Sequence, residues 1–177
     1  TVDSKGSVFV AQTDARNDIN GRSGTKNHSL KELENRAFLN QITRVRLNEN
    51  KSEKPTFINL EPLPPKHPET GQALATPFAI EISDDDSTLV VTAAGSDKVF
   101  TVDTKSGNIM GRVNVESSPR GIALEQSSKG RPSQAWILNA VANSVSLVDV
   151  SDPRNLSVKA KITLEDPTHP AFKRGRI

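Results

Sequence analysis

Two consecutive stretches of this chain decide its fold. Residues 77–118 read PFAIEISDDDSTLVVTAAGSDKVFTVDTKSGNIMGRVNVESS, and residues 119–166 read PRGIALEQSSKGRPSQAWILNAVANSVSLVDVSDPRNLSVKAKITLED. The second stretch starts 42 residues after the first, because Pro119 takes the place of Pro77. In each, four short segments of alternating apolar and polar residues are separated by clusters of Asp, Ser, Asn, Gly or Pro. This pattern predicts four antiparallel β-strands joined by tight turns.

The predicted strands occupy matching places in the two copies. They are expected at 78–82, 88–93, 98–103 and 108–115 in the first copy, and at 121–125, 135–140, 144–149 and 157–164 in the second. Asp103 and Asp149 lie 46 residues apart, four more than the two prolines, so the second copy carries a four-residue insertion near 129–133. Such an insertion is expected in a loop, where extra residues are tolerated.

An incomplete third copy precedes these two. SVFVAQTDA at 7–15 resembles the second strand of the repeat, QITRVRLN at 41–48 the third, and PTFINLEP at 55–62 the fourth, while the first strand is missing. Its second strand lies 81 residues before the second strand of the 77–118 copy, whereas its third strand lies only 57 residues before the third strand of that copy. About 24 extra residues therefore separate the two strands. Within them HSLKELENRAFL, at 28–39, has capping-box spacing and an apolar face, which predicts a short helix.

Tandem four-stranded units of about 40 to 50 residues are typical of β-propeller blades. We therefore predict an all-β fold, a partial β-propeller of about three four-stranded antiparallel blades, the first incomplete, with one short helix in a long loop. The expected parts are an incomplete blade at 1–63 with a helical insertion at 17–40, a loop at 64–76, blades at 77–118 and 119–166, and a linker at 167–177. Propellers have at least about four blades. The remainder of the same polypeptide, or another protein, is expected to complete the ring.

The repeats resemble the YVTN-type propeller repeat. PFAI and PRGI match the opening of its first strand, and VFTVD and VSLVD match its third. The ending DPTHPAFKRGRI, at 166–177, resembles the linker in bacterial proteins that join such a propeller to a diheme cytochrome c peroxidase-like domain. The resemblance implies a periplasmic or extracellular bacterial redox protein whose haem c is bound downstream. This chain has no cysteine, so no CxxCH haem attachment lies in it, and no cofactor is expected here beyond a possible calcium ion.

Composition narrows the classes of partner. Twenty-three basic and 21 acidic residues give a net charge of +2, too balanced for a nucleic-acid-binding surface. No run of about 18 apolar residues is present, so no membrane span is predicted. The missing cysteines also exclude disulfides and thiolate metal sites within this sequence.

Three groups of polar residues are candidate sites. The oxygen-rich loop TDARNDING could bind calcium, but a hydrogen-bonded Asx-rich turn leaving a strand is the simpler interpretation. Its candidate ligands are Asp14, Asn17, Asp18 and Asn20. The run Asp84–Asp86 could act as an acid/base pair, but its place between two strands predicts a solvated hairpin. The histidines, in three separate loops without metal-ligand spacing, are His28, His67 and His169.

The basic tail could dock an acidic redox partner, because local charge steers encounter. Its cations are Lys173, Arg174 and Arg176, and the simpler interpretation is a solvated linker. Trp136, the only tryptophan, lies beside Ile137 and Leu138 and is predicted to be in the core.

These patterns favour a non-catalytic propeller segment that acts as a scaffold or docking module of a larger cytochrome c-associated redox protein. Its contacts would use the 17–40 insertion and the 64–76 loop. Two alternatives stay open. One is a lactonase-like propeller hydrolase with a divalent metal in the central channel. The inner strands, however, offer mainly apolar residues, with Glu81 and Glu125 between them; the apolar residues are Phe78, Ile80, Ile82, Ile122 and Leu124. The other is a module that binds a surface polymer.

Overall fold

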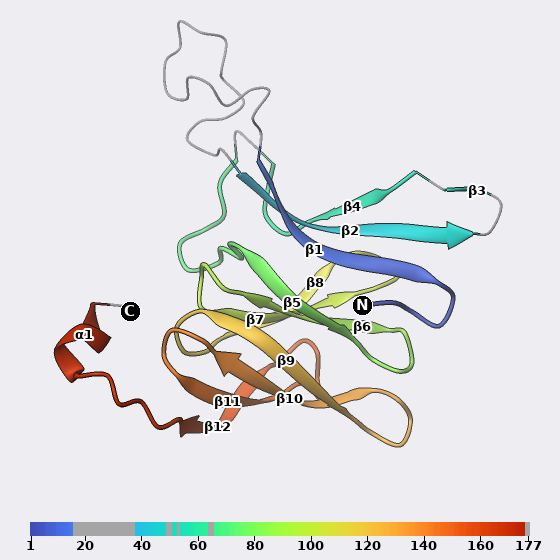
Figure 1. The fold of residues 1–177 in the computed structure, drawn as a ribbon. Coiled ribbons are helices and arrows are strands. Elements are labelled where there is room, and N and C mark those ends of the chain that lie inside the picture. Colours follow the sequence, from blue (N-terminus) through green and yellow to red (C-terminus); the bar gives the residue numbers. More distant parts are fainter. Residues whose placement is uncertain (16–37, 49–50, 53, 64–65, 176–177) are drawn as a thin grey trace, which may run out of the picture.

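The computed structural model describes the chain except for residues 16–37, 49–50, 53, 64–65 and 176–177. The described part contains three four-stranded antiparallel sheets and one five-residue helix. Figure 1 shows the sheets stacked one on another like adjacent blades of a ring. The chain is therefore a partial β-propeller, as the sequence predicts.

The two complete blades follow the predicted repeat closely. Blade 2 consists of β5 (Pro77–Ile82), β6 (Thr88–Ala93), β7 (Lys98–Asp103) and β8 (Ile109–Asn114), paired in that order. Blade 3 consists of β9 (Pro119–Gln126), β10 (Pro132–Asn139), β11 (Ser144–Asp149) and β12 (Ser157–Thr163). The predicted insertion lengthens the β9–β10 hairpin, since Pro132 pairs with Gln126 inside the ladder, and so it does not form a larger loop.

Blade 1 is built from β1 (Ser7–Ala15), β2 (Phe38–Asn48), β3 (Lys51–Ser52) and β4 (Thr56–Asn59). Its missing first strand is represented by residues 1–3, because Val2 bridges Val8 and the Phe9 amide donates to the Thr1 carbonyl at 2.9 Å. The predicted helix lies outside the described residues apart from its last two positions. There the helix prediction is wrong, because Phe38 pairs with Ala15 and extends the β1–β2 ladder.

The blades have two faces, which we name by their turns. Face A carries the turns at 83–87, 104–108 and 127–131, and face B carries the turns at 94–97 and 140–143 and the connection at 60–76. The strand β5 contacts both β1 and β9, so blade 2 lies between blades 1 and 3. The outer strands are β4, β8 and β12 (Figure 1).

Two apolar layers hold the three blades together. Because strand side chains alternate, β6 sends Leu89 and Val91 toward blade 1 and Val90 toward blade 3. The first layer includes Phe9, Ile42 and Phe100, and the second includes Ile137 and Val148. Burying one such side chain stabilises a fold by about 1.5–3 kcal/mol. Blade 2 is thus packed on both sides.

After β12 the chain leaves blade 3 and forms α1 (Pro170–Arg174) near face B (Figure 1). Phe172 in this helix is 73% exposed. None of the helical structure in the described part of the chain has the length and apolar character required to cross a bilayer.

Candidate functional site

The outer sheet face of blade 3 is apolar and has no described blade against it. In this face Leu138 lies opposite Val145, which lies opposite Ile162, and Trp136 lies opposite Leu147. Leu138 is 45% exposed and Ile162 is 50% exposed. We call these five side chains the open face of blade 3.

The equivalent face of blade 2 shows how these positions are buried when a neighbouring blade is present. In blade 2 the positions equivalent to Trp136, Leu138, Val145 and Leu147 are Val90, Thr92, Val99 and Thr101. All four blade 2 side chains are 0% exposed, because blade 3 covers them. The open face of blade 3 therefore has the position, and a more apolar composition, of a surface that packs against a neighbouring blade.

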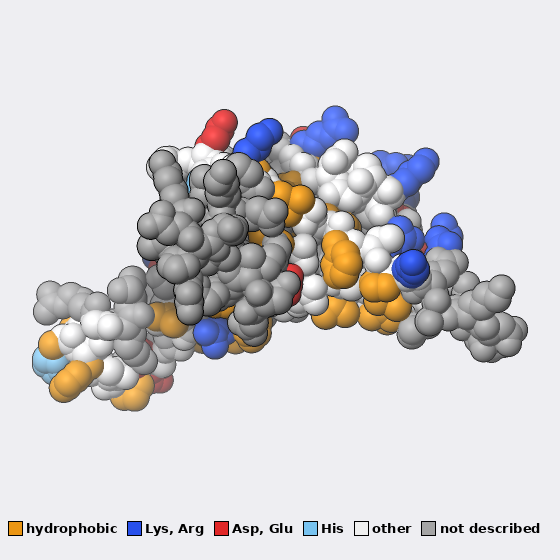
Figure 2. Space-filling view, turned by 90° about the horizontal axis from the view of Figure 1, so that it is seen from above, with side chains coloured by type: hydrophobic (Ala, Val, Ile, Leu, Met, Phe, Trp, Pro, Cys, Tyr) orange, Lys and Arg blue, Asp and Glu red, His pale blue; other side chains and the backbone are white. Residues whose placement is uncertain are grey.

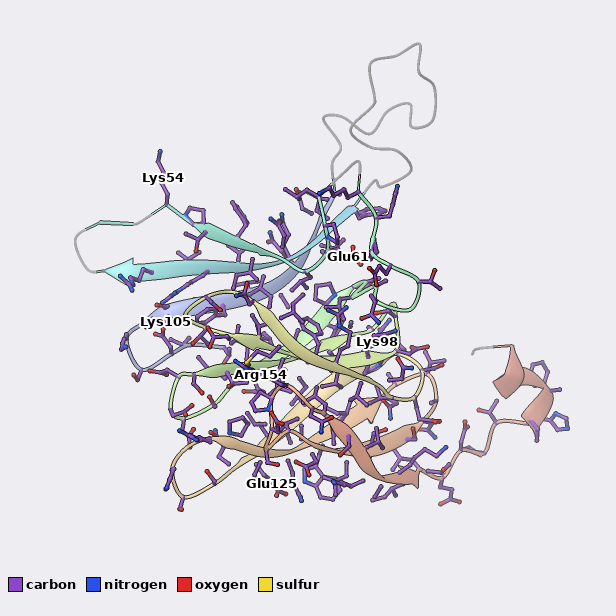
Figure 3. All side chains as sticks on the ribbon, turned by 180° about the vertical axis from the view of Figure 1, so that it is seen from behind. Lys54, Glu61, Lys98, Lys105, Glu125 and Arg154 are labelled. Atoms are coloured by element: carbon purple, nitrogen blue, oxygen red, sulfur yellow. The ribbon has the colours of Figure 1, made fainter. Side chains whose placement is uncertain are left out.

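Trp136 is only partly buried, so the prediction that it lies in the core is wrong. Its indole Nε1 donates a hydrogen bond to Glu125 Oε1 at 2.6 Å. The side chain points to the open face because β10 alternates, with Ala135 and Ile137 pointing to blade 2 instead. Glu125 accordingly lies over the same face (Figure 3).

Blade 1 has a second open face at the other end of the stack. Its exposed apolar residues are Val10, 45% exposed, and Phe57, 54% exposed, with the partly buried Val8 and Val45 beside them. Seen from this side, hydrophobic side chains gather in the middle of the molecule (Figure 2). Thr43, also on this face, has a buried hydroxyl without a hydrogen-bond partner among the described residues.

The inner strands present one aromatic and one cation. Phe78 on β5 is 52% exposed, and the guanidinium of Arg120, at the equivalent position of β9, lies 5.2 Å from the centre of its ring. The Nε of Arg120 donates to Ser118 Oγ at 3.2 Å. The aliphatic side chains of the inner strands pack into the two apolar layers and do not line the central channel. They are Ile80, Ile82, Ile122 and Leu124.

The run Asp84–Asp86 links all three blades on face A. Asp86 Oδ1 accepts from the Ser4 amide of blade 1 at 2.9 Å, and Asp84 Oδ1 accepts from Gln126 Nε2 of blade 3 at 2.6 Å. The hairpin is present as predicted, but these carboxylates bind neighbouring blades and are not simply solvated. A role as an acid/base pair has no geometric support.

Asp85, between them, stays ionised. Burial tends to raise its pKa, but hydrogen bonds from Ser83 and Ser87 and the nearby Arg131 together hold the pKa below the ordinary value. Ser83 Oγ donates to Asp85 Oδ1 at 2.7 Å, and Arg131 Nε lies 3.9 Å from Asp85 Oδ2. This anion therefore adds a contact between blades 2 and 3.

On face B, a side-chain oxygen of one blade accepts a hydrogen bond from the backbone amide just before the next blade, and this contact occurs twice in the described part of the chain. We call it the clasp; the sequence did not predict it. Asn40 Oδ1 accepts from the Thr76 amide at 3.0 Å, and Asp97 Oδ1 accepts from the Ser118 amide at 2.8 Å. Thr76 and Ser118, just before the repeat prolines, both have positive φ, at 53° and 59°. At the equivalent of Asp97 in blade 3, Asn143 Nδ2 donates to the Glu165 carbonyl at 3.1 Å instead. The two contacts span 36 and 21 residues, so the available signal was the place of these residues in the repeat: Asn40 is the equivalent of Asp97, and Thr76 and Ser118 each precede a repeat proline.

Most of the predicted ligands are not brought together in the described part of the chain. Asp14 is exposed at the end of β1, while Asn17, Asp18, Asn20 and His28 lie outside the described residues. The ring centroids of His169 and Phe172 are 6.3 Å apart. Lys173 and Arg174 belong to α1, and Arg176 lies outside the described residues. Within the described ranges, no three His, Asp or Glu side chains form a metal-binding group.

A groove of about 820 Å³ lies between blades 1 and 2 on the side of β4 and β8. Its wall includes His67 and Glu69 from the 60–76 connection and Arg112 from β8. Burial lowers the pKa of Arg112, and the neighbouring Glu61 carboxylate opposes that shift. Arg112 Nη1 also donates to the Gln72 carbonyl, so the guanidinium fastens the connection to blade 2. The wall of this groove thus carries both acidic and basic side chains.

The chain matches no protein-family model, and no curated protein matches it in sequence. It is similar in structure to hydrazine synthase of Kuenenia stuttgartiensis, with a TM-score of 0.62 and 13% identity over 84% of this chain and 44% of that one. It also resembles the periplasmic gluconolactonase of Pseudomonas aeruginosa, with a TM-score of 0.52 and 18% identity over 75% of this chain and 38% of that one.

A third similar structure is the Cps50 (Swd1) β-propeller domain of Myceliophteria thermophila, with a TM-score of 0.51 and 14% identity over 72% of this chain and 43% of that domain. At these identities the likeness shows the fold alone. The chain spans less than half the length of each of these structures.

Proposed function

We propose that this chain is a non-catalytic segment of a β-propeller and serves as a scaffold or docking module of a larger redox protein. The observation that carries the proposal is the open face of blade 3, where Trp136, Leu138 and Ile162 occupy positions that pack against a blade elsewhere in the repeat. Exposed apolar patches on folded domains mark surfaces that bind other protein. The expected occupant is a further blade.

The redox part of the proposal comes from the resemblance of the sequence to propeller/cytochrome c peroxidase-like fusions, which implies a periplasmic or extracellular protein. In that setting haem c belongs to a downstream domain, and this chain holds that domain or its partner. The basic end of the chain, with Lys173, Arg174 and Arg176, would attract an acidic redox partner. A calcium ion at Asp14 and the loop after it is part of the same proposal.

The proposal can be tested with the single tryptophan as a probe. Trp136 emission is measured for the chain alone and after adding a separately produced polypeptide that carries the remaining blades. Covering the open face removes water from the indole, so the emission is expected to move to shorter wavelength. Leu138→Asp should abolish that shift, and Lys129→Asp, at an exposed position of the β9–β10 turn, should preserve it. A complex that leaves the emission unchanged would contradict the proposal.

A direct enzyme assay distinguishes the lactonase-like alternative from the scaffold proposal. The gluconolactonase among the similar structures motivates glucono-δ-lactone as the substrate, tested with and without calcium, magnesium or zinc. The scaffold proposal expects hydrolysis at the background rate in every condition. Metal-dependent turnover that is lost in Arg120→Ala, on the inner strand β9, would favour the hydrolase.

The cytochrome association has its own measurement. Titration calorimetry of the chain with a c-type cytochrome is expected to show binding that weakens as salt is raised, because screening acts on attraction between charged surfaces. Substituting Lys173 and Arg174 with Gln should weaken it further, and Lys129→Gln should not. If neither salt nor these substitutions changes the affinity for the cytochrome, the proposed attraction between charged surfaces is contradicted.

A further inference from the structure

The inner edge of blade 1 is only partly covered. The segment at 1–3 stands where β5 and β9 stand in the complete blades, and it lies beside only one end of β1 (Figure 1). Val2 bridges Val8, and it is therefore the equivalent of Ile82 in blade 2. Along residues 10–13 the same edge has no strand beside it in the described part of the chain.

The backbone of β1 shows which groups face this edge. The Phe9 amide donates to the Thr1 carbonyl at 2.9 Å, and the Thr1 nitrogen donates to the Phe9 carbonyl at 3.1 Å. The peptide groups of Phe9 thus point away from β2, and because these directions alternate along a strand, those of Ala11 and Thr13 point to the same edge. Neither residue has a backbone hydrogen bond on that edge to any described residue. Each therefore offers one donor and one acceptor to a further strand.

The side chains of this edge lack the usual protection against a further strand. Residues 10–13 read VAQT, without a proline or a charged residue. Exposed edges of stable sheets are commonly protected by lysine, proline or a covering loop. The outer edge of blade 3 follows that rule, because β12 carries Lys159 and Lys161. The inner edge of blade 1 does not follow it, as expected of an edge that receives a strand.

The two complete blades show what such a strand contains. When the register of the 1–3 segment is continued, the position that would pair with Val10 is held by Ile80 in blade 2 and Ile122 in blade 3. Both isoleucines pack into an apolar layer. The residue before each isoleucine is small, namely Ala79 or Gly121. Val10 is 45% exposed, so an isoleucine opposite it would lie against exposed apolar surface.

We propose that the inner edge of β1 binds an extended segment of a partner polypeptide, antiparallel to β1, with a small residue opposite Ala11 followed by an isoleucine opposite Val10. The partner backbone would bond to Ala11 and Thr13, and the isoleucine would continue the apolar row that begins with Val2, which is 55% exposed. Strand addition of this kind takes its affinity from main-chain hydrogen bonds and its specificity from alternate side chains. The site lies at the other end of the stack from the open face of blade 3, so a negative result here would leave the proposed function standing.

The proposal is tested by NMR titration of the chain with a peptide taken from the first strand of blade 3, Ser-Pro-Arg-Gly-Ile, the sequence of residues 118–122. The amides of Ala11 and Thr13 are expected to shift saturably. Two altered peptides are the controls. One has N-methylglycine in place of glycine, which removes the amide that would donate to Ala11, and the other exchanges the last two residues, which moves the isoleucine to the opposite face.

Both altered peptides should bind at least about tenfold more weakly, the effect of losing one hydrogen bond and leaving its partner unpaired. The absence of saturable shifts, or equal binding of the three peptides, would overturn the proposal.

Variants of β1 locate the site. Ala11→Pro removes an amide that has no described partner and spares the ladder to β2, so it should weaken peptide binding at least about tenfold while blade 1 stays folded. Gln12→Ala changes the next residue, whose peptide group faces β2, and should leave the peptide affinity unchanged. Circular dichroism checks the fold of each variant, and the altered peptides test the same bond in the unaltered chain. If Ala11→Pro binds the peptide as the parent chain does, the peptide binds elsewhere and the site does not exist.

Discussion

Strands β6 and β10 hold the same place in consecutive blades, yet they are buried differently. All six residues of β6, TLVVTA, are buried, whereas β10 alternates between buried and partly exposed positions along AWILN. The face of β10 that carries Trp136 and Leu138 is more apolar than the matching face of β6, with Val90 and Thr92, and yet it is less buried. The neighbours on each side of a blade therefore decide how far its strands are buried, and blade 3 has apolar residues on a face that no described blade covers.

The largest effect is expected from two adjacent residues of β10. Ile137 is 0% exposed between blades 2 and 3, so Ile137→Ala should lower the free energy of unfolding by about 2–5 kcal/mol. Leu138 points to the open face and is 45% exposed, so Leu138→Ala should cost less than about 1 kcal/mol. Urea unfolding followed by circular dichroism measures both. Similar losses would mean that the open face is covered in solution.

A smaller effect is expected where blade 3 touches β8. A Cβ at Gly111 would lie 2.6 Å from the Pro153 carbonyl oxygen and 3.0 Å from the Arg154 carbonyl carbon. Gly111→Ala should therefore destabilise the chain by about 1–3 kcal/mol, because backbone atoms of the next blade must move. The measurement is again the midpoint of urea unfolding.

The equivalent position in blade 3 provides the control. It is Ala160, which is exposed because no described loop approaches it. Ala160→Gly should change stability by less than about 1 kcal/mol. A blade that covers the open face must leave room for the Ala160 methyl group, so it cannot repeat the close approach that Pro153 makes to Gly111. An unchanged midpoint for Gly111→Ala would refute the described contact.

The smallest effect concerns Asp149, which ends β11 as Asp103 ends β7. Hydrogen bonds from Ser151 and the nearby Lys159 lower the pKa of Asp149 from 3.8 to about 2. A lowered pKa stabilises the fold above pH 3.8, and that stabilisation is lost as the pH falls toward 2. Because the carboxylate is 31% exposed, the contribution should be below about 1 kcal/mol.

Asp149→Asn should therefore reduce stability slightly at neutral pH and flatten the loss between pH 4 and pH 2. Thermal unfolding of both forms at several pH values provides the comparison. Asp103→Asn is the matched variant, since its pKa is also lowered, chiefly by hydrogen bonds from Ser106. An Asp149→Asn chain with the same acid sensitivity as the parent would contradict the assigned pKa.

Strand positions could be predicted because alternation and turn residues are local signals. Three predicted strands of the two full copies, 88–93, 98–103 and 144–149, match the structure residue for residue. The ends of β9 and β10 were missed because the four-residue insertion joins the ladder, a choice made by pairing across the hairpin. The clasps of Asn40 and Asp97 were missed because each joins residues at least 21 positions apart.

The repeat, the four-stranded unit and the order of the strands could be predicted from the sequence, since each follows from the spacing of apolar and turn-forming residues along short segments. The folded arrangement was needed to show which strand faces are covered, that Trp136 lies on an open face, and that Arg44, Arg46 and Lys54 line one cavity. These depend on how blades stack, which brings distant parts of the chain together and which no local pattern records.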